Sequence, residues 1–311
     1  MEKEGLVAKI AQLARLVNAS PMKLFIAVLF LCIAGASYAA PMKALIVDGQ
    51  NNHDFRSTTP HLKKIIEETG LFTVDVATTP GQGKDMSTFS PEFSNYKVII
   101  SNYNGEPWSP ETQQAFEKYV RGGGGFVSVH AADNAFPQWK AYNEMIGIGG
   151  WNNRNEKSGP YLRLRDGKFQ HLAAPGPGGS HGKQHAFLME TRDASHPIMA
   201  GLPPKWMHAK DELYDRLRGP AENVTVLASA FSAKEQSGTG ENEALLMVIP
   251  YGQGRVFHTA LGHNNGKDLA AQRCAGFITT LQRGVEWAAT GKVTQKVPDD
   301  FPTAEKVSLR D

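Results

Sequence analysis

Short apolar segments alternate with more polar segments along the first half of the chain. The pattern predicts strands and intervening helices, with strands at 43–47, 72–77, 97–101 and 126–129, and helices at 60–69 and 110–121. Pro60 and Gly70 suit the first turn and the end of one helix, and Ser109 suits the N-cap of the other. Strands that alternate with helices predict an α/β fold with a doubly wound, mostly parallel sheet.

The second half of the chain begins with a long irregular segment. Residues 149–182 are rich in Gly, Pro and Arg, and we expect an excursion with a few short strands that covers the site. Further strands are expected at 224–230 and on both sides of a turn at 251–254, before a closing helix at 268–290. Cys274 falls on the apolar face of this helix, which predicts a core residue.

The N-terminal segment differs in character from the rest of the chain. After Met22 come one lysine, an apolar run and small residues, with Ser37 and Ala39 at the positions of a signal-peptidase site. This pattern predicts export to the periplasm or medium after cleavage behind Ala39, because the run is too short for a permanent membrane anchor. Whether Met1 or Met22 is the true start stays open. The expected parts are an extension with a signal peptide at 1–39, one domain at 40–293 and a tail at 294–311.

Composition adds few limits on function. The chain has 311 residues, of which 41% are hydrophobic, so it is long enough to bury a core without other support. A formal net charge of +2 with scattered basic residues argues against a nucleic-acid partner. One of the two cysteines, Cys32, lies in the predicted signal peptide, so we expect no disulfide within the exported chain. A homo-oligomer stays open.

Polar loops follow three of the predicted strands. The loops DGQNNHDFR, NYNGEPW and HAADNAF come directly after the strands at 43–47, 97–101 and 126–129. Ligands of doubly wound sheets bind beyond the carboxyl ends of the strands. These loops therefore predict the site, and their candidate side chains are His53, Arg56, Asn104, Trp108, His130 and Asp133.

Histidines are the candidate chemical groups of this region. His130 ends a strand before two alanines that permit a tight turn, His53 follows the first strand, and His263 follows the last. His258 is expected to be structural, because its odd spacing from His263 puts the two side chains on opposite faces of a strand. Three imidazoles with a carboxylate suit a divalent metal, zinc above all, and without metal they suit acid–base chemistry near neutral pH. The structural alternatives are a core histidine for His130 and loop hydrogen bonds for His53.

Four motifs occur in an order that resembles the ThuA-like (trehalose utilisation) family: GQNNHDFRSTTP, GGGGFVSVHAADNAF, SHPIMAGLP followed by KDELYD, and GRVFHTALGH. The resemblance covers residues 42–291. It implies the flavodoxin-like fold of class I glutamine amidotransferases, here with a long irregular insertion, and a link to the catabolism of trehalose and 3-keto-sugars. In amidotransferases of this fold a cysteine nucleophile stands where His130 stands here. Glutamine hydrolysis needs a thiolate, so the resemblance without that cysteine disfavours a glutaminase.

The resemblance also draws attention to the acidic motif KDELYD. Asp211 or Glu212 is expected as a general base or a metal ligand, and a solvated helix start is the structural alternative. His181 and His185 have a spacing that holds a metal on a helix, but the glycines around them argue against a helix there.

We expect an exported enzyme that acts on a glycoside, with a 3-keto-glycoside as the specific candidate. The ketone would acidify the neighbouring C2–H, and a histidine or Glu212 would remove that proton. His130 would act as base or ligand, and His53 and His263 as ligands or electrophiles. The expected substrate contacts are Arg56, Asn104, Trp108 and Asp133.

Two other functions stay open. One is a sugar-binding or scaffold protein that has lost the amidotransferase cysteine, since Trp108, Trp139 and Trp151 suit stacking on sugars. The other is amidohydrolysis by a metal-bound water in place of the thiolate.

Overall fold

The computed structural model describes residues 40–264, 266 and 268–311. The predicted signal peptide and its cleavage site lie outside the described residues. Within these ranges, no helix combines the length and the apolar character that crossing a membrane requires.

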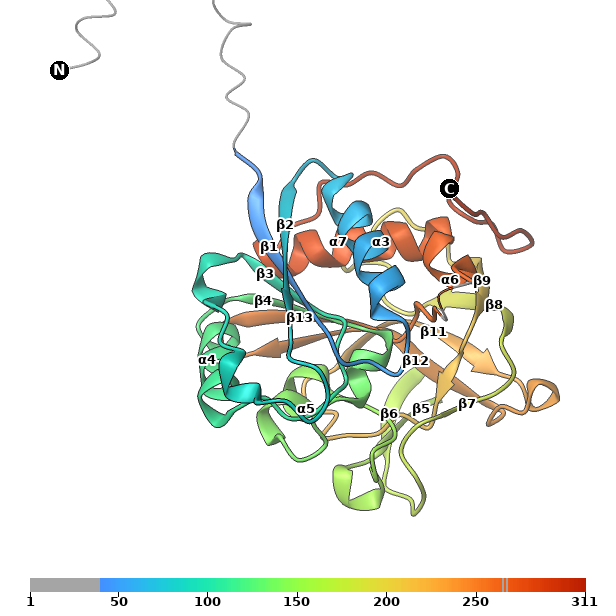
Figure 1. The fold of residues 1–311 in the computed structure, drawn as a ribbon. Coiled ribbons are helices and arrows are strands. Elements are labelled where there is room, and N and C mark those ends of the chain that lie inside the picture. The colour runs from blue at the N-terminus through green and yellow to red at the C-terminus, as the bar shows by residue number, and fades with distance from the viewer. Residues whose placement is uncertain (1–39, 265, 267) are drawn as a thin grey trace, which may run out of the picture. The chain divides into compact units, whose positions relative to one another are not determined.

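A nine-stranded sheet forms the centre of the fold (Figure 1). Its strands in chain order are β1 (Met42–Asp48), β2 (Phe72–Thr78), β3 (Val98–Ser101), β4 (Gly125–Val129), β8 (His185–Thr191), β9 (Lys205–Asp211), β11 (Thr225–Ser232), β12 (Glu241–Tyr251) and β13 (Gly254–Thr259). Their order in the sheet is β2-β1-β3-β4-β13-β12-β11-β8-β9.

The sheet has two halves that differ in strand direction. The half β2-β1-β3-β4-β13 is parallel and has the strand order of flavodoxin-like sheets. The half β12-β11-β8-β9 is joined to it and within itself by antiparallel pairs. The predicted α/β class is confirmed, and the antiparallel half is an addition that the hydrophobic pattern only partly predicted.

Helices cover both faces of the sheet. They are α3 (Phe55–Glu67), α4 (Pro110–Arg121), α5 (Lys140–Ile146), α6 (Ala270–Arg273) and α7 (Ala275–Thr290). Helices α3 and α7 contact each other on one face, and α4 and α5 lie on the other (Figure 1). Short 3-10 helices occur at 86–88, 93–95, 130–134, 156–158 and 234–236.

The predicted excursion at 149–182 contains short strands, as expected. A hairpin joins β5 (Tyr161–Arg165) to β6 (Lys168–Leu172). Strand β7 (Ser180–His181) pairs instead with β10 (Tyr214–Asp215), which is the end of the acidic motif KDELYD. This non-local pairing brings the end of the excursion beside the acidic motif.

The first helix begins before the predicted start. Asp54 is its N-cap: the carboxylate accepts a hydrogen bond from the Arg56 amide, and the carbonyl oxygen accepts one from the Thr58 amide. The helix therefore starts at Phe55, and Pro60 lies inside it rather than in its first turn. As a consequence, the polar loop after β1 runs directly into the helix and Arg56 belongs to the first turn.

The closing helix is interrupted at Cys274. This residue has an extended backbone (φ −64°, ψ 123°) and separates α6 from α7. Its side chain is fully buried, which confirms the expected core position. The C-terminal residues pack beside the break, since the Ala275 amide donates to the Ser308 carbonyl and the Arg310 amide to the Arg273 carbonyl.

Candidate active site

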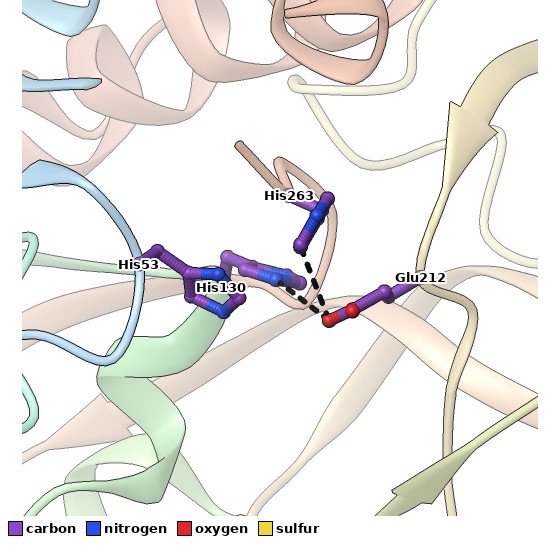
Figure 2. Close-up of side chains that lie close together, drawn as sticks. All are labelled: His53, His130, Glu212 and His263. Carbon is purple, nitrogen blue, oxygen red and sulfur yellow. Dashed lines mark ion pairs between the residues drawn. The ribbon is translucent and has the colours of Figure 1, made fainter. Parts of the chain in front are cut away.

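Four side chains converge at the carboxyl edge of the sheet: His53, His130, Glu212 and His263 (Figure 2). Each offers one nitrogen or oxygen atom, and these atoms all lie within 4.8 Å of one another. The three histidines follow the parallel strands β1, β4 and β13. Glu212 follows β9, which runs in the same direction as β13 because four successive antiparallel pairings separate the two strands. All four residues therefore come from the carboxyl ends of strands that run the same way, where ligands bind in such folds.

His130 stands on a strained turn at the end of β4. Its φ is 47°, a left-handed conformation that costs a non-glycine residue roughly 1–3 kcal/mol. A sharp turn of this kind after a central strand presents the catalytic nucleophile in other α/β enzymes. The turn that carries the nucleophile in those enzymes, which we call the elbow, is therefore present, and here it carries the imidazole of His130. The ring stacks on Tyr214 with 4.2 Å between centroids.

The hydrogen bonds of His130 fix the orientation of its ring. Its Nδ1 lies 2.8 Å from the carbonyl oxygen of Ala260, and because a carbonyl only accepts, Nδ1 carries a proton. Its Nε2 is left facing Glu212 Oε2 at 3.6 Å (Figure 2). Burial lowers the pKa of His130, but the interaction of its ring with the accepting Glu212 carboxylate and the charges of Asp211 and Glu212 outweigh it and raise the pKa above its ordinary value.

Glu212 is the centre of the cluster and is 8% exposed. Its Oε2 lies 3.2 Å from His263 Nδ1, and its Oε1 lies 3.1 Å from Gln184 Nε2 and 3.5 Å from His181 Nε2. Burial raises the pKa of Glu212, but the hydrogen bonds and charges of His130 and His263 outweigh it and hold the pKa well below its ordinary value. The side chain is therefore an ionised carboxylate at neutral pH.

His53 is a neutral imidazole between the other two. Its ring centroid lies 4.8 Å from those of both His130 and His263. Burial and these two neighbouring histidines lower the pKa of His53 to about 3. A neutral ring keeps a lone pair for a metal, since ligands must be deprotonated to bind one.

Asp211 is fully buried and positions two residues of the cluster through hydrogen bonds to their backbone amides. Its Oδ2 lies 2.7 Å from His208 Nε2 and accepts a hydrogen bond from the Gly262 amide. Its Oδ1 accepts hydrogen bonds from the amides of Glu212 and His263. The sequence left Asp211 and Glu212 as alternatives for base or ligand. The structure distinguishes the two carboxylates. Both oxygens of Asp211 already accept hydrogen bonds from buried donors, so Glu212 is the candidate for base or ligand.

The cluster borders a cavity of about 340 Å³, whose lining includes His53, Glu212 and Trp151. A larger cavity of about 960 Å³ adjoins it, and we call this larger one the cleft. Asn104 lines both spaces, and Arg56 lines the cleft. The structure thus places two of the expected substrate contacts on cavity walls.

The other two expected substrate contacts are wrong. Trp108 is 3% exposed, and its ring packs against Phe116 and Phe136 in the core. Burial of so large an apolar ring outweighs its position in a polar loop. Asp133 is fully buried, and its Oδ2 lies 3.3 Å from Nε2 of His258. His258 is itself fully buried, which matches its expected structural position.

Prediction from the sequence missed two side chains of the site, Gln184 and Tyr214, and discounted a third, His181. Gln184 bridges Glu212 and His263, Tyr214 lies under the His130 ring, and His181 faces Glu212 from a strand rather than a helix. All three depend on the pairing of β7 with β10. Only the HGKQH spacing gave a signal, and it was discounted because the glycines around it argue against the helix that this spacing needs.

The cluster fits a divalent transition metal by its donor set. His130 Nε2 and His263 Nδ1 are buried and both face Glu212 Oε2, and neither has another hydrogen-bond partner among the described residues. Three imidazole nitrogens and one carboxylate oxygen are typical ligands of zinc. Tetrahedral zinc spaces its ligand atoms about 3.4 Å apart, so the widest separation, 4.8 Å, would have to shrink on binding.

The comparisons with known proteins agree on one family. The model of the ThuA family, described as trehalose utilisation, matches residues 43–288. The chain is 50% identical to a ThuA-like protein from Parabacteroides merdae, with a TM-score of 0.85, 87% of this chain covered and 98% of the other. A ThuA-like protein from Bacteroides uniformis shares the fold at 20% identity and a TM-score of 0.53, with 84% and 96% covered. No protein of curated function matches.

Proposed function

This chain belongs to the ThuA family, described as trehalose utilisation, and on that premise we propose that it is an exported enzyme acting on a glycoside, specifically a 3-keto-glycoside. One observation carries the proposal: three imidazoles and an ionised carboxylate lie within 4.8 Å of one another beside a cavity. Export rests on the predicted signal peptide.

The charge states of Glu212 and His53 suit metal ligands better than proton carriers. Glu212 and His53 have lowered pKa values and are therefore weak bases, but both stay deprotonated, as ligands must. Together with His130 and His263 they would hold one divalent metal. When bound, the metal would supply positive charge next to the carbonyl oxygen of the keto-sugar, where negative charge develops.

His181 is the best-placed proton carrier outside this set. Its Nδ1 lies 2.8 Å from the Gly182 carbonyl and so carries a proton, while its Nε2 lies 3.5 Å from Glu212 Oε1 and the residue lines the smaller cavity. In the proposed reaction Nε2 takes the proton from C2 of the sugar. The electrons of that C–H bond form a double bond between C1 and C2, the C1–O bond breaks, and the leaving oxygen takes up a proton.

The function is tested with 3-keto-glycosides and protein purified without chelator. We expect about one equivalent of a divalent metal per chain, turnover of at least one keto-glycoside, and loss of turnover on chelation that the same metal reverses. No release of the leaving group from any 3-keto-glycoside would overturn the proposal. Glutaminase activity is not expected, since Cys274 is fully buried and His130 occupies the elbow.

A non-catalytic sugar-binding protein is the second candidate. The half-buried rings of Trp139 and Trp151 line the cleft and the smaller cavity, and such rings suit stacking on sugars without chemistry. Calorimetry separates the two functions. Binding of unmodified sugars that is as tight as binding of their keto derivatives, with neither turned over, would favour the second.

A further inference from the structure

We propose that Glu212 bridges two metal ions and that the second ion binds at Glu212 Oε1 and His181 Nε2, on the side of the smaller cavity. This second site is weaker than the four-residue cluster described above, and it takes a divalent transition metal such as zinc. Its occupation inhibits the enzyme, because it uses the lone pair of His181. The site itself does not depend on the proposed function, whereas the inhibition rests on it.

The two oxygens of Glu212 face different nitrogen atoms. Oε2 faces His130 Nε2 at 3.6 Å and His263 Nδ1 at 3.2 Å, both of which belong to the cluster. Oε1 lies outside that arrangement, 3.5 Å from His181 Nε2 and 3.1 Å from Gln184 Nε2. Each carboxylate oxygen has its own lone pairs, so an ion on Oε2 leaves those of Oε1 for a second ion. The carboxylate can therefore hold one ion on each side.

The contact between Glu212 and His181 needs a cation. Glu212 is an ionised carboxylate, and the Gly182 carbonyl, 2.8 Å from His181 Nδ1, holds the ring proton on Nδ1. Two lone pairs therefore face each other across the 3.5 Å between Oε1 and Nε2. A proton on Nε2 would form at best a long hydrogen bond at this distance. Tetrahedral zinc places its ligand atoms about 3.4 Å apart, so a metal ion fits the gap as it stands.

Gln184 supplies a third ligand when its amide turns. Its Nε2 lies 3.1 Å from both Glu212 Oε1 and His263 Nε2. A half-turn of the amide exchanges nitrogen for oxygen, so Oε1 then points to the second ion beside Glu212. The same oxygen accepts a hydrogen bond from Nε2 of His263, which carries the ring proton once Nδ1 binds the first ion. One change in Gln184 thus serves both ions.

The surroundings of His181 make the second ion weakly bound and exchangeable. The His181 side chain is 36% exposed and lines the smaller cavity together with Trp151 and Tyr214, so an ion can enter and leave through this cavity. Among the described residues, Glu212 is the only acid that lines it. The charge of Glu212 is shared with the first ion, and the two ions repel each other. The second ion is therefore lost during gel filtration, and the purified protein keeps only the first.

Occupation of the second site blocks the base of the proposed reaction. There His181 Nε2 takes the proton from C2 of the sugar, and it cannot do so while the same lone pair binds a metal. The first ion is then required for turnover, whereas the second inhibits it. We expect the rate to rise with the first equivalent of zinc and to fall as zinc is increased further.

Calorimetry with zinc tests the second site without turnover. After removal of metal with a chelator, we expect two classes of site in the full chain, the second at least ~100-fold weaker. His181→Ala should abolish the weak class and leave the strong one. His185→Ala is the matched control and should keep both, since the His185 ring has the same kind of hydrogen bond, to the Lys183 carbonyl, but packs against Phe187. A single class in the wild type, or a weak class that survives in His181→Ala, overturns the site.

Substitution of Gln184 should strengthen or weaken the second site according to the group introduced. Gln184→Glu replaces the amide by a carboxylate of the same shape, so we expect it to tighten the weak class at least ~10-fold, equivalent to about 1.4 kcal/mol. Gln184→Leu is the matched control, has no ligand oxygen and should weaken that class. Equal affinity in the two variants overturns the third ligand.

Electron paramagnetic resonance with copper distinguishes a shared carboxylate from adventitious binding at surface histidines. Imidazole nitrogen binds Cu²⁺ as well as zinc. The first equivalent should give the spectrum of an isolated ion. The second should weaken and broaden that spectrum, because ions that share one carboxylate lie about 4 Å apart and couple magnetically. Two signals that simply add would overturn the bridge through Glu212.

Turnover separates failure of this inference from failure of the proposed function. If calorimetry and resonance show the second ion but no keto-glycoside is turned over, the proposed function fails and the second metal site stands. If a keto-glycoside is turned over and zinc binds in a single class, the function stands and the second site fails. If both are found but excess zinc does not slow turnover, the inhibition is overturned, and with it the role of His181 as the base.

Discussion

The two halves of the sheet contribute different parts of one site. The parallel half supplies three imidazoles, His53, His130 and His263, from loops that follow β1, β4 and β13. The antiparallel half supplies the single carboxylate, Glu212, from the end of β9. The difference teaches that strand direction, rather than parallel pairing, decides where a side chain reaches the site. Strand β9 contributes because it runs in the same direction as β13.

The halves also differ in how they hold their residues. On the parallel side, His130 depends on a strained turn and one hydrogen bond to the Ala260 carbonyl. On the antiparallel side, the buried Asp211 carboxylate accepts hydrogen bonds from the amide of Glu212 and, across the boundary between the halves, from the amide of His263. Substitutions on the antiparallel side should therefore affect either charge or stability, depending on which of the two adjacent acids is changed.

Removing the negative charge of Glu212, the carboxylate that the antiparallel half supplies, should have the largest effect on activity. Glu212→Gln keeps the shape of the side chain but loses the negative charge that faces His130 and His263. We expect kcat/KM for a keto-glycoside to fall ~1,000-fold, equivalent to about 4 kcal/mol, with little change in melting temperature. The control is Glu235→Gln, the same change at an exposed residue of this half. Activity within tenfold of the wild type would show that the carboxylate is not needed.

Changing the neighbouring acid should affect stability instead of charge at the site. Asp211→Asn weakens the pairing with His208 and places an amide NH₂ group among buried donors from Gly262 and His263. We expect the free energy of unfolding to fall by about 3 kcal/mol, because one partner of a buried charged pair is lost. Urea unfolding measures this value. The opposite pattern, normal stability with lost activity, would make Asp211 a direct participant in the reaction.

On the parallel side, the elbow histidine should control metal content. His130→Ala removes one of three imidazoles, so we expect bound divalent metal to fall from one equivalent to nearly none and kcat/KM to fall ~100-fold. Metal analysis after gel filtration gives the first value. His185→Ala is the control, since His185 belongs to the HGKQH spacing but its Nδ1 lies 2.7 Å from the Lys183 carbonyl, outside the cluster. Unchanged metal content in His130→Ala would remove the elbow from the ligand set.

The fold of the parallel half was predictable because its signals are local. Buried apolar runs alternate with capped helices, and each strand pairs with a strand of the same βαβ pattern. The antiparallel half was less predictable. Strands β8 and β9 alternate only imperfectly between buried and more exposed residues, and neither strand was predicted.

The histidines of the site were predictable from one physical rule, and its other members were not. His53, His130 and His263 follow strands, so the carboxyl-end rule found them. Glu212 came only from its motif, because nothing local shows that β9 runs in the same direction as β13. Gln184 was missed, because it reaches Glu212 only after β7 pairs with β10.

Substitution of Trp108 should have the smallest effect. This residue marks the boundary between the core and the site within the parallel half. Trp108 belongs to the same loop as Asn104, but its ring is in the core and only Asn104 borders the cavities. Trp108→Phe leaves a cavity, and this cost is partly offset because the buried indole Nε1 has no hydrogen-bond partner among the described residues. We expect the free energy of unfolding to fall by about 1 kcal/mol.

The catalytic readout decides what this small change means. Values of KM and kcat for a keto-glycoside should stay within about twofold for Trp108→Phe, because a residue that packs in the core acts on stability and not on bound substrate. Asn104→Ala is the matched comparison from the same loop, and it should raise KM several-fold by removing an amide shared by both cavities. If Trp108→Phe raises KM as much as Asn104→Ala does, the boundary between core and site lies deeper in the parallel half than the packing of Trp108 indicates.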